Sequence, residues 1–537
     1  MTNGNEQVRL NDCVALLDSV RSRGNTARIA FTVRNATHIE AVVLKLRNAV
    51  HPVEYSLPFT VSESNGQLHV NAVLEPGKLA LQEIFWEVFA SVDCDGEGQL
   101  VPIKFGKRER RMLYLRNQQW RLADGKVLFT HVNKQDCLSF VYRDYYPRYD
   151  TYALRIKEFA ALGAFTLMRP YWKNRRIWLV YEKFCKTAQD NGFYFFEYCM
   201  GLPEQERAHI FYVIDEDSPD LENVRKHGKQ VIRFMSFKHL LYSLAANLYI
   251  ASDSKMHLYV WRSKPSLIRH AISRHKLFFL QHGVTALKRV DQLFGAHGSN
   301  PATYFLTTSE NEQSIVTEHF GYAASHAPVL GFSRWDALED RSSSTRRSIL
   351  LMPTWRPWLE EQDDETFVES DYYAAYSELI QNEELGKLLE RHDAVLKFFI
   401  HPKLSERLHT FVANDARIEL IPQGSTPLNQ LLMECDMLVT DYSSVCWDML
   451  FMGKPVVFYQ FDRDVYEAVV GSYIDLKSEL PGDSCLTSED VIASIEKCAA
   501  RGYAMEPEHE DLARSWFAYR DTRNCERTYA FIVEEGF

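Results

Sequence analysis

From about residue 150 onward, the chain alternates short apolar runs with polar segments long enough to form helices. This pattern is typical of βαβ units, in which helices connect the strands of a parallel sheet. The runs are too many for one sheet of ordinary size, so we predict two doubly wound sheets. The expected strands are IWLVYE (177–182), HIFYVID (209–215), LYIAS (248–252), LFFLQH (277–282), TYFLTT (303–308), SILLMPT (348–354), AVLKFFIH (394–401), MLVTD (437–441) and VVFYQ (456–460).

Changes in composition along the chain indicate the domain organisation. A chain of 537 residues is too long for a single hydrophobic core. Residues 1–147 contain alternating runs such as RIAFTVRN and QLHVNAVL between turn sequences, which predicts a β-sandwich-like accessory domain without chemistry of its own. The polar, serine-rich segment from Gly331 to Ser348 then separates two Rossmann-like domains, which we place at residues 148–340 and 341–537 and expect to face each other across a cleft.

The composition excludes several classes of protein. Hydrophobic residues make up 46% and charged residues 25%, as in an ordinary globular protein. The net charge of −11 argues against a nucleic-acid partner. Ten cysteines without metal-ligand spacing predict reduced thiols and no zinc site. The N-terminal MTNGNEQVRLND lacks the pattern of a secretory signal, and no apolar run is long enough to span a membrane, so we expect a cytoplasmic protein.

Polar residues gather at the ends of the expected strands. In open parallel sheets, ligands bind at the carboxyl ends of the strands. This edge is therefore the expected active site. The residues that end or follow the expected strands are Glu182, Asp215, Asp253, His282, Thr354, His401 and Asp441.

Two histidines at strand ends are candidates for proton transfer. In QHGVTALKR, His282 precedes Gly283, a residue that lets the backbone turn, and Lys288 follows nearby. In FIHPKL, His401 is followed by Lys403. Histidine can accept a proton from an attacking hydroxyl near neutral pH. A single histidine at a strand end is more often structural, but two that face one cleft shift the balance towards a catalytic pair.

The sequence LMPTWRP offers groups that bind phosphate. Thr354 supplies a hydroxyl and Arg356 a guanidinium suited to a diphosphate oxygen, whereas Trp355 fits a packing role. No glycine-rich phosphate loop follows these strands. We therefore expect Lys, Arg, His and a helix N-terminus to neutralise a leaving group, with no metal cofactor.

The run DMLVTDYSSVCWDMLFMGKPVVFY places two serines between a strand and a helix. The apolar spacing after Ser443 and Ser444 predicts that these serines open the helix, where backbone N–H groups and hydroxyls form a seat for phosphate. The alternative is that Asp441 or Ser443 is only an N-cap.

Taken in order, QHGVTALKR, LMPTWRP, FIHP and TDYSSVCWDMLFMGKPVVFY resemble the motifs of the CDP-glycerol glycerophosphotransferase family, which includes teichoic-acid polymerases and primases and capsule enzymes. The resemblance covers about Ile177 to Asp462. It implies a GT-B fold with an acceptor-side domain followed by a domain that binds the CDP-linked donor. The implied reaction transfers glycerol phosphate from CDP-glycerol to a hydroxyl of a teichoic-acid-like or capsule polymer and releases CMP.

The resemblance also implies roles for single residues. It makes His282 the catalytic base and His401 its catalytic partner; His401 also joins Arg356, Ser443 and Ser444 in binding the diphosphate. The other family-matching positions are Gly283, Lys288, Asp441, Asp448 and Lys454, the last two without an assigned role. Val284 and Ala286 depart from the threonine and proline that the family commonly has after HG, which puts donor or acceptor specificity in question.

The acceptors of this family are usually lipid-linked, and one segment fits a membrane surface. ALRIKEFAALGAFTLMRPYWKNRRIW mixes apolar and basic residues and could lie on the anionic inner face of the plasma membrane, or simply be a solvated helix. Three other functions stay open: a transferase that uses CDP-ribitol or another CDP-polyol, a GT-B glycosyltransferase that uses a nucleotide sugar, and a non-catalytic scaffold that binds polymer.

Overall fold

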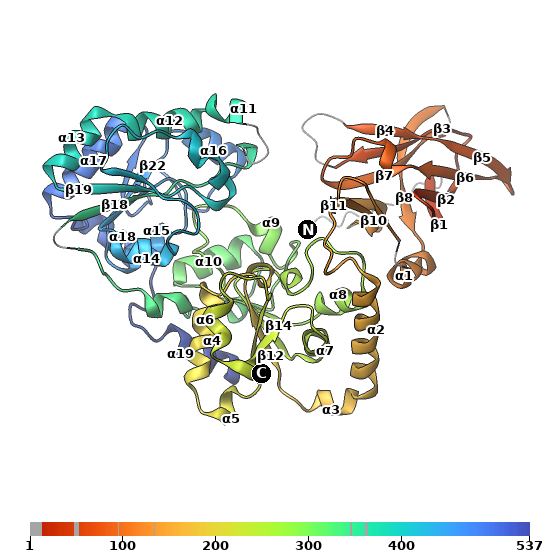
Figure 1. Ribbon diagram of the computed structural model, residues 1–537, viewed down its shortest axis with the longest axis horizontal. Helices are drawn as coiled ribbons and strands as arrows, with labels where there is room; N and C mark the ends of the chain where they lie inside the picture. Colours follow the sequence, from red (N-terminus) through yellow and green to blue (C-terminus); the bar gives the residue numbers. More distant parts are fainter. Residues whose placement is uncertain are drawn as a thin grey trace. The chain divides into compact units, whose positions relative to one another are not determined.

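The computed structural model describes residues 13–47, 53–94, 96–116, 118–133, 135–343, 346–359 and 364–537. The sequence MTNGNEQVRLND, on which the expectation about a secretory signal depends, lies outside the described residues. The chain divides into two compact units (Figure 1). The first comprises the described part of residues 1–172 together with 259–274, and the second comprises the described part of 173–258 and 275–537.

The first unit is a β-rich body in which alternate residues of strands such as β6 and β7 are buried. In the described residues its hydrogen-bonded path runs β5-β6-β2-β1-β8-β7-β11-β10-β9, with β3 paired to β7 and to β4. Strand β8 connects the two halves of this path, because it pairs parallel with β1 and antiparallel with β7. The strands are β1 Val14–Arg23, β2 Thr26–Arg34, β3 His38–Leu46, β4 Glu54–Leu57, β5 Phe59–Ser64, β6 Gln67–Leu74, β7 Ile84–Cys94, β8 Glu97–Phe105, β9 Gln119–Arg121, β10 Lys126–Val132 and β11 Leu138–Asp144.

The sequence pattern of this unit predicted its core. Ile29, Phe31 and Val33 of β2 are fully buried, and Val70 and Ala72 of β6 are nearly so, as the alternation indicated. They pack with apolar residues of β3, β7 and β11 in one core that is shared by both halves of the strand path. The helices of the unit are α1 Lys107–Leu115, α2 Tyr152–Leu167, α8 Leu267–Ile272 and most of α3 Arg169–Lys173.

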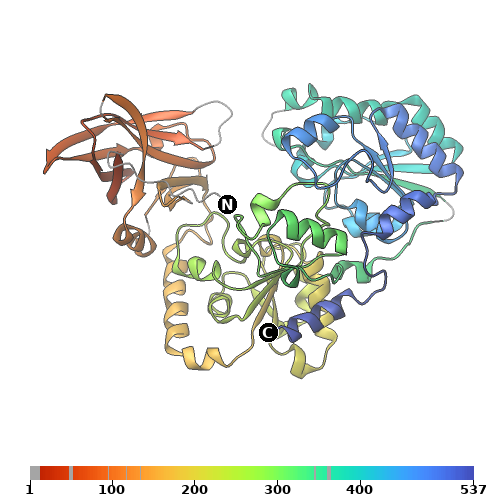
Figure 2. The ribbon, with the colours of Figure 1, turned by 180° about the vertical axis from the view of Figure 1, so that it is seen from behind.

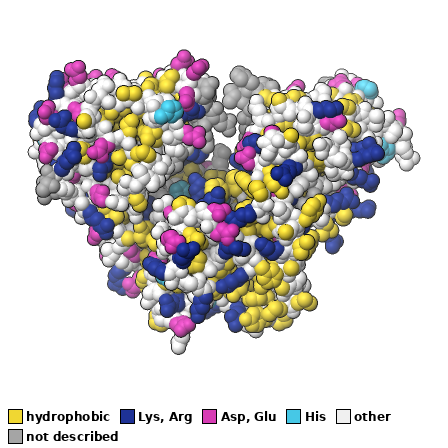
Figure 3. All heavy atoms as spheres, in the orientation of Figure 1, with side chains coloured by type: hydrophobic (Ala, Val, Ile, Leu, Met, Phe, Trp, Pro, Cys, Tyr) yellow, Lys and Arg dark blue, Asp and Glu magenta, His cyan; other side chains and the backbone are white. Residues whose placement is uncertain are grey.

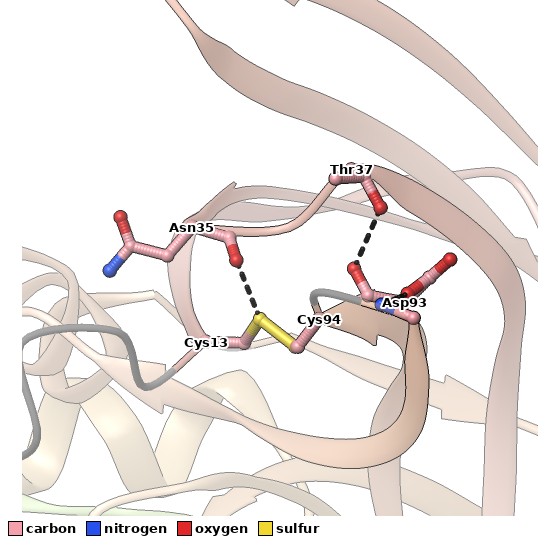
Figure 4. Close-up of a disulfide and its surroundings, with 6 residues drawn as sticks. Cys13, Asn35, Thr37, Asp93 and Cys94 are labelled. Carbon is pink, nitrogen blue, oxygen red and sulfur yellow. Dashed lines mark hydrogen bonds between the residues drawn. A yellow bond between two sulfur atoms is a disulfide. The ribbon is translucent and has the colours of Figure 1, made fainter.

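A disulfide joins Cys13, just before β1, to Cys94 at the end of β7 (Figure 4). The carbonyl oxygen of Asn35 lies 2.8 Å from Sγ of Cys13. The other eight cysteines are buried free thiols. The expectation of reduced thiols throughout is therefore wrong for this pair, because folding brings together two residues that are 81 positions apart in sequence.

The second unit contains two sheets with the same strand order. In the described residues each sheet has six strands, all parallel, in the orders β14-β13-β12-β15-β16-β17 and β20-β19-β18-β21-β22-β23. Numbered along the chain, both orders read 3-2-1-4-5-6, the doubly wound arrangement of Rossmann folds. The strands are β12 Trp178–Tyr181, β13 Ile210–Ile214, β14 Val231–Arg233, β15 Leu248–Ala251, β16 Leu277–Phe279, β17 Tyr304–Phe305, β18 Arg347–Leu351, β19 Ala394–Phe398, β20 Ile418–Leu420, β21 Met437–Thr440, β22 Val456–Tyr459 and β23 Asp483–Cys485.

All nine strands expected from the apolar runs are present, each slightly shorter than its run. The sequence did not predict β14, β20 and β23. Each of these has three residues and forms an outer strand of its sheet. A strand with one neighbour needs only a short apolar stretch, so its sequence signal is weak.

Helices connect the strands, and the last helix returns to the first sheet of the unit. Helix α19 contacts α4 and the 3-10 turn Ser333–Ala337, and Figure 2 shows it beside the elements of the first sheet, far from the rest of the C-terminal region. The helices are α4 Asn191–Gly201, α5 Glu204–Arg207, α6 Leu221–Arg225, α7 Phe237–Ala245, α9 Asp291–Phe294, α10 Glu310–His319, α11 Asp364–Val368, α12 Asp371–Gln381, α13 Glu383–Arg391, α14 Leu428–Glu434, α15 Cys446–Phe451, α16 Arg463–Val469, α17 Ser488–Ala500, α18 Pro507–Arg514 and α19 Asn524–Glu534.

The segment between the two sheets begins as a packed turn. Arg334 donates two hydrogen bonds to the carboxylate of Asp448 on α15, at 2.9 and 3.0 Å, and one of 3.1 Å to Asp190, the N-cap of α4. Asp336 accepts hydrogen bonds from the backbone N–H groups of Asn524 and Cys525 at the start of α19. Elements of both sheets are therefore tied to the same turn. Residues 344 and 345 of the polar segment lie outside the described residues.

No helix in the described part of the chain combines the length and the apolar character that crossing a bilayer requires.

Candidate functional site

A cavity of about 230 Å³ in the second unit is lined by loops that follow strands of both sheets. The loop after β16 contributes His282, Gly283 and Lys288. The loops after β18, β19 and β21 contribute Thr354 and Trp355, then His401, then Tyr442, Ser443 and Ser444. Strands β18 and β21 are the first and fourth of their sheet, where the strand order reverses and ligands of such folds bind. The structure thus brings seven of the sequence-predicted residues to one cavity.

The ring of His282 is held in one tautomer. Its Nδ1 lies 3.1 Å from the carbonyl oxygen of Ser252, which follows β15. A carbonyl oxygen can only accept, so Nδ1 carries the proton and the lone pair is on Nε2. The side chain is exposed and lines the cavity. His282 can therefore accept a proton through Nε2.

The ring of His401 has the opposite arrangement. The backbone N–H of Lys403 donates to Nδ1 of His401 at 3.2 Å, so Nδ1 carries the lone pair and Nε2 carries the proton. Burial, followed by the charges of Lys183, Lys403 and Lys288, lowers the pKa of His401 to about 4. Near neutral pH this ring is uncharged and can donate from Nε2. One cavity thus holds a proton acceptor and a proton donor.

Two lysines from opposite sheets meet on one indole ring. Nζ of Lys403 lies 3.5 Å from the ring centre of Trp355, and Nζ of Lys288 lies 5.0 Å from the same centre. The ring of Trp355 also packs against His401, with 6.2 Å between the centres. Cation–π attraction to one ring offsets the repulsion between two lysines held near each other. Trp355 therefore organises a positively charged wall that suits a phosphate group.

The hydroxyl of Thr354 lines the cavity and is not matched inside the protein. Its Oγ1 is shielded from solvent and has no hydrogen-bond partner among the described residues. A buried hydroxyl without a partner is costly, so its presence requires an explanation. A phosphate oxygen of a ligand in this cavity would supply the missing acceptor.

Ser443 and Ser444 lie in a turn and do not open the helix. The predicted start of the helix at Ser443 was three residues too early, since α15 begins at Cys446. The carbonyls of Ser443 and Ser444 accept from the backbone N–H groups of Cys446 and Trp447, each at 3.2 Å, and Oγ of Ser443 accepts from that of Val445 at 3.4 Å. The serines form a tight turn whose hydroxyls line the cavity.

Gly283 lets the loops of the two sheets touch. A Cβ atom on residue 283 would lie 2.2 Å from Oγ and 2.6 Å from Cβ of Ser444. Both distances are far below van der Waals contact, so only glycine fits without a shift of backbone. The residue after His282 is therefore in direct contact with the serine turn of the other sheet.

Arg356, predicted to bind the diphosphate, is buried and does not line the cavity. Its side chain is 0% exposed and donates to Asp462 at 2.6 and 2.9 Å, to Asp441 at 2.8 Å and to the carbonyl of Thr354 at 2.7 Å. Burial lowers its pKa, but Asp441 and Asp462 together raise the pKa well above the usual value. Arg356 thus holds the Thr354–Trp355 loop in place from its buried side.

Asp441 completes this buried support. Its carboxylate accepts from the backbone N–H groups of Thr354 and Tyr442, at 2.8 and 2.6 Å, and from the hydroxyl of Tyr376 at 3.1 Å. The residue is 0% exposed and connects the loops after β18 and β21. It positions the cavity wall without facing the cavity.

The family-matching residues Asp448 and Lys454 lie away from the cavity as well. Asp448 receives Arg334, as described above, and the indole N–H of Trp335 at 2.7 Å. Nζ of Lys454 donates to the carbonyls of Leu432, Met433 and Cys435 at 3.1, 2.6 and 2.7 Å, and it pairs with Asp340 at 2.9 Å. A cation at the carbonyl end of α14 stabilises that helix. Both residues serve the architecture.

Sequence reasoning missed the buried network that supports His282. Gln281 has a positive φ of 57° and donates through its amide to Glu312 at 3.0 Å. The carboxylate of Glu312 also accepts from the backbone of Thr285 and Thr308, each at 2.7 Å. Burial raises the pKa of Glu312. No sequence motif includes Glu312, so sequence reasoning could not find this network.

A second overlooked pair lies beside Ser252. Nδ1 of His257 is 3.3 Å from Asp253. Burial raises the pKa of Asp253, but its hydrogen bond to His257 and the charges of His257 and His282 lower it to about 2. Asp253 is therefore an anion at neutral pH and lies close enough to His282 for a charge interaction between them. The strand-end rule flagged Asp253, but its histidine partner was not foreseen.

The fold and the cavity define an α/β protein whose two Rossmann-order sheets enclose a basic site with a proton acceptor and a proton donor. Comparison with known proteins identifies the family. The chain belongs to the CDP-glycerol:poly(glycerophosphate) glycerophosphotransferase family, whose model matches residues 164–534. The resemblance noted in the sequence is thereby confirmed.

The relatives include proteins of teichoic acid synthesis. The chain is 26% identical over 375 residues to the minor teichoic acid biosynthesis protein GgaB of Bacillus subtilis (strain 168), covering 67% of this chain and 40% of GgaB. It is 27% identical over 225 residues to the teichoic acid poly(ribitol-phosphate) polymerase of Bacillus spizizenii, covering 37% of this chain and 33% of that protein. The matches thus span less than half of either relative. A solved structure of the wall teichoic acid polymerase TagF (H548A) has a TM-score of 0.49 at 15% identity, over 72% of this chain and 98% of that one.

Proposed function

We propose that this chain transfers glycerol phosphate from CDP-glycerol to a hydroxyl of a teichoic-acid-like or capsule polymer, with release of CMP. The observation that carries the proposal is the opposite proton arrangement of His282 and His401 in one basic cavity. Phosphoryl transfer to a hydroxyl needs a base for the attacking oxygen and donors for the phosphate oxygens. Membership of the family supports the same reaction.

In the proposed mechanism the acceptor hydroxyl gives its proton to Nε2 of His282. Its oxygen forms a new bond to the β-phosphorus of CDP-glycerol as the bond from that phosphorus to the oxygen of CMP breaks. The products are a phosphodiester and CMP. Asp253 stabilises the positive charge that forms on His282. Positioning and electrostatics supply most of the rate.

The phosphate oxygens of the donor would be held by the other side of the cavity. Nε2–H of His401 and the hydroxyls of Thr354, Ser443 and Ser444 donate to them, and the charges of Lys288 and Lys403 offset the charge of the leaving CMP. No metal ion has a part in this scheme. Arg356 acts through the loop that it supports.

The two Rossmann-order sheets fit the two halves of a GT-B fold. The sheet with β16 would form the acceptor side and the sheet with β18 and β21 the donor side, because the former carries the base and the latter the phosphate donors. The β-rich first unit would be an accessory domain, which fits the sandwich-like body expected from sequence.

CDP-ribitol is the second candidate donor. One relative is named as a poly(ribitol-phosphate) polymerase, and the cavity residues described above contact phosphate without distinguishing the polyol. A nucleotide-sugar glycosyltransferase and a non-catalytic polymer-binding scaffold are the remaining alternatives. The first would share the fold and the diphosphate contacts, and the second has no use for the paired histidines.

Nucleotide release by the purified protein tests the proposal. The donors are CDP-glycerol, CDP-ribitol and several UDP-sugars, offered with a glycerol-phosphate oligomer, with and without EDTA. We expect CMP with CDP-glycerol and no effect of EDTA. Release of CMP with CDP-ribitol alone would show that the donor is CDP-ribitol. Release of UDP from a sugar donor would show that the protein is a glycosyltransferase. No nucleotide release from any donor would favour the non-catalytic scaffold.

A membrane surface is the proposed location of the acceptor. Helix α2 and the start of α3 expose Tyr152, Ile156 and Leu167, with side chains 71%, 70% and 86% accessible. Figure 3 shows the apolar side chains gathered over these helices. Exposed apolar groups next to Lys157 and Arg169 suit an anionic bilayer. We expect the protein to float with anionic liposomes, and the double variant Ile156→Ser and Leu167→Ser to float less. A protein that stays at the bottom of the gradient would contradict binding to the membrane.

A further inference from the structure

The first unit contains a polar cavity that the proposed reaction does not use. It has a volume of about 250 Å³ and lies between β1 and α1. This volume is many times the roughly 30 Å³ that one water molecule occupies. Its charged lining consists of Arg21, Arg108 and Arg116 together with Asp18 and Glu109. Ser19 and Gln118 add neutral polar groups.

The three arginines of this cavity are exposed, and within the described part of the chain they have no ionic partner. Among the described residues, none of their guanidinium groups has an ion pair or a side-chain hydrogen bond. Other arginines of the same unit are paired: Arg47 with Glu87 at 2.5 Å and Arg110 with Asp136 at 2.6 Å. Guanidinium groups bind phosphate oxygens through two parallel hydrogen bonds. The cavity therefore offers donors that the fold itself does not consume.

The placement of the basic residues does not serve stability. Arg21 lies directly opposite Arg28 in the antiparallel pair of β1 and β2, and like charges in that position are destabilising. Lys107 and Arg108 occupy the first turn of α1, where the helix dipole disfavours cations. Figure 3 shows Lys and Arg side chains grouped along the part of this unit where Figure 1 places α1. An anionic ligand would relieve both conflicts.

The two carboxylates narrow the class of ligand. Oδ2 of Asp18 accepts from the hydroxyl of Thr32 at 2.8 Å and keeps further lone pairs for the cavity. A simple anion would be repelled by Asp18 and Glu109. A chain in which phosphates alternate with hydroxyl-bearing carbons matches both kinds of group, since arginines bind the phosphates and carboxylates accept from the hydroxyls.

We propose that this cavity binds the phosphodiester backbone of a polyol-phosphate polymer, so that the first unit holds the chain that the second unit extends. The choice of polymer rests on the proposed function. The protein as a whole carries a net charge of −11, so a polyanion needs such a local cationic site to be retained.

Calorimetry of the full chain with a glycerol-phosphate oligomer, without any donor, tests the proposal. The triple variant Arg21→Gln, Arg108→Gln and Arg116→Gln should bind about tenfold or more weakly, because three charge-assisted contacts are lost. A control variant with Arg34→Gln, Lys78→Gln and Arg121→Gln removes the same charge from exposed positions of the same unit. The control should bind like the unaltered chain.

Two further arms make the outcome decisive. The variant with lysine at positions 21, 108 and 116 keeps the charge and should recover part of the affinity, which shows that the glutamine variant was not simply unfolded. Equal losses in the test and control variants, or no binding by the unaltered chain, overturn the proposal. Because no donor is present, binding that depends on the arginines stands even if CMP release fails, and CMP release without such binding removes this inference alone.

Discussion

The two sheets of the second unit have the same strand order but present different chemistry at their carboxyl edges. The loop after β16 places His282 in the cavity with a lone pair, and neutral or acidic groups support it from behind. The loops after β18, β19 and β21 present hydrogen-bond donors, and a buried Arg–Asp cluster supports them.

The difference shows that topology fixes where a site lies and that the buried polar groups beneath each loop fix what the site does. A strand order that reverses at one point creates the same opening in both sheets. Ser252, Gln281 and Glu312 support the loop of His282, the proposed base, whereas Arg356, Asp441 and Asp462 hold the loops proposed to bind phosphate.

Removing the base tests the first edge and should have the largest effect. His282→Ala should lower the rate of CMP release about 10²–10⁴-fold, because the acceptor hydroxyl loses its general base. Calorimetry should show CDP-glycerol affinity reduced only modestly. A similar loss of turnover and of donor binding would instead place His282 on the structural side of the comparison.

Removing the buried cation tests the support of the second edge. Arg356→Gln should lower the free energy of unfolding by about 3–5 kcal/mol, because Asp441 and Asp462 are left buried with no cation. Chemical denaturation measures the change. Lys403→Gln removes the same charge from an exposed side chain and should change stability by less than about 0.5 kcal/mol while weakening donor binding. If both variants lost donor binding and neither lost stability, Arg356 would belong with the ligand contacts.

Filling the contact between the edges probes both at once. Gly283→Ala should destabilise the protein by about 1–3 kcal/mol and lower turnover, because the new methyl group meets Ser444. Adding Ser444→Gly removes both clashing atoms and should restore stability in thermal unfolding. A Gly283→Ala protein with unchanged stability and turnover would show that the two loops do not meet.

The acid dependence of stability sharpens the comparison of the two histidines. The pKa of His401 is lowered to about 4 in the native protein. Between that pH and about 6.5, the histidine is therefore protonated in the unfolded chain and uncharged in the native chain. Stability from this group is complete above about pH 6.5 and falls as the pH drops. His401→Asn keeps an N-cap acceptor without titrating, so it should lose about 2 kcal/mol less than the parent between pH 7 and pH 5 in urea titrations. Equal losses in both proteins would contradict the lowered pKa.

The apolar runs were sufficient to predict the strands of both sheets, because strands buried on both faces need continuous apolar sequence. The positions of polar residues at strand ends then predicted that His282, His401 and Thr354 share one edge, and all three line the cavity. Both predictions use local sequence alone, and they succeed because a buried strand and the position of its end depend mainly on local sequence.

The role of Arg356 could not be read in the same way. Its partner Asp462 is 106 residues away, and a cation after a strand looks identical in sequence whether it binds a ligand or a distant carboxylate. Glu312 and the Cys13–Cys94 disulfide were missed for the same reason, since each depends on pairing between remote segments. Sequence pattern locates polar groups, but tertiary contacts decide whether they face a ligand or the core.

The glycine at position 283 also bears on how such proteins can be recombined. Because Gly283, next to the proposed base, packs directly against Ser444, the loops of the two sheets have complementary surfaces beside the proposed reaction site. Since Gly283 and Ser444 both belong to the motifs that resemble the family, a chimaera that takes its first sheet from one family member and its second from another should keep this fit. Shuffled genes should therefore yield active enzymes as long as neither Gly283 nor Ser444 is replaced by a larger residue.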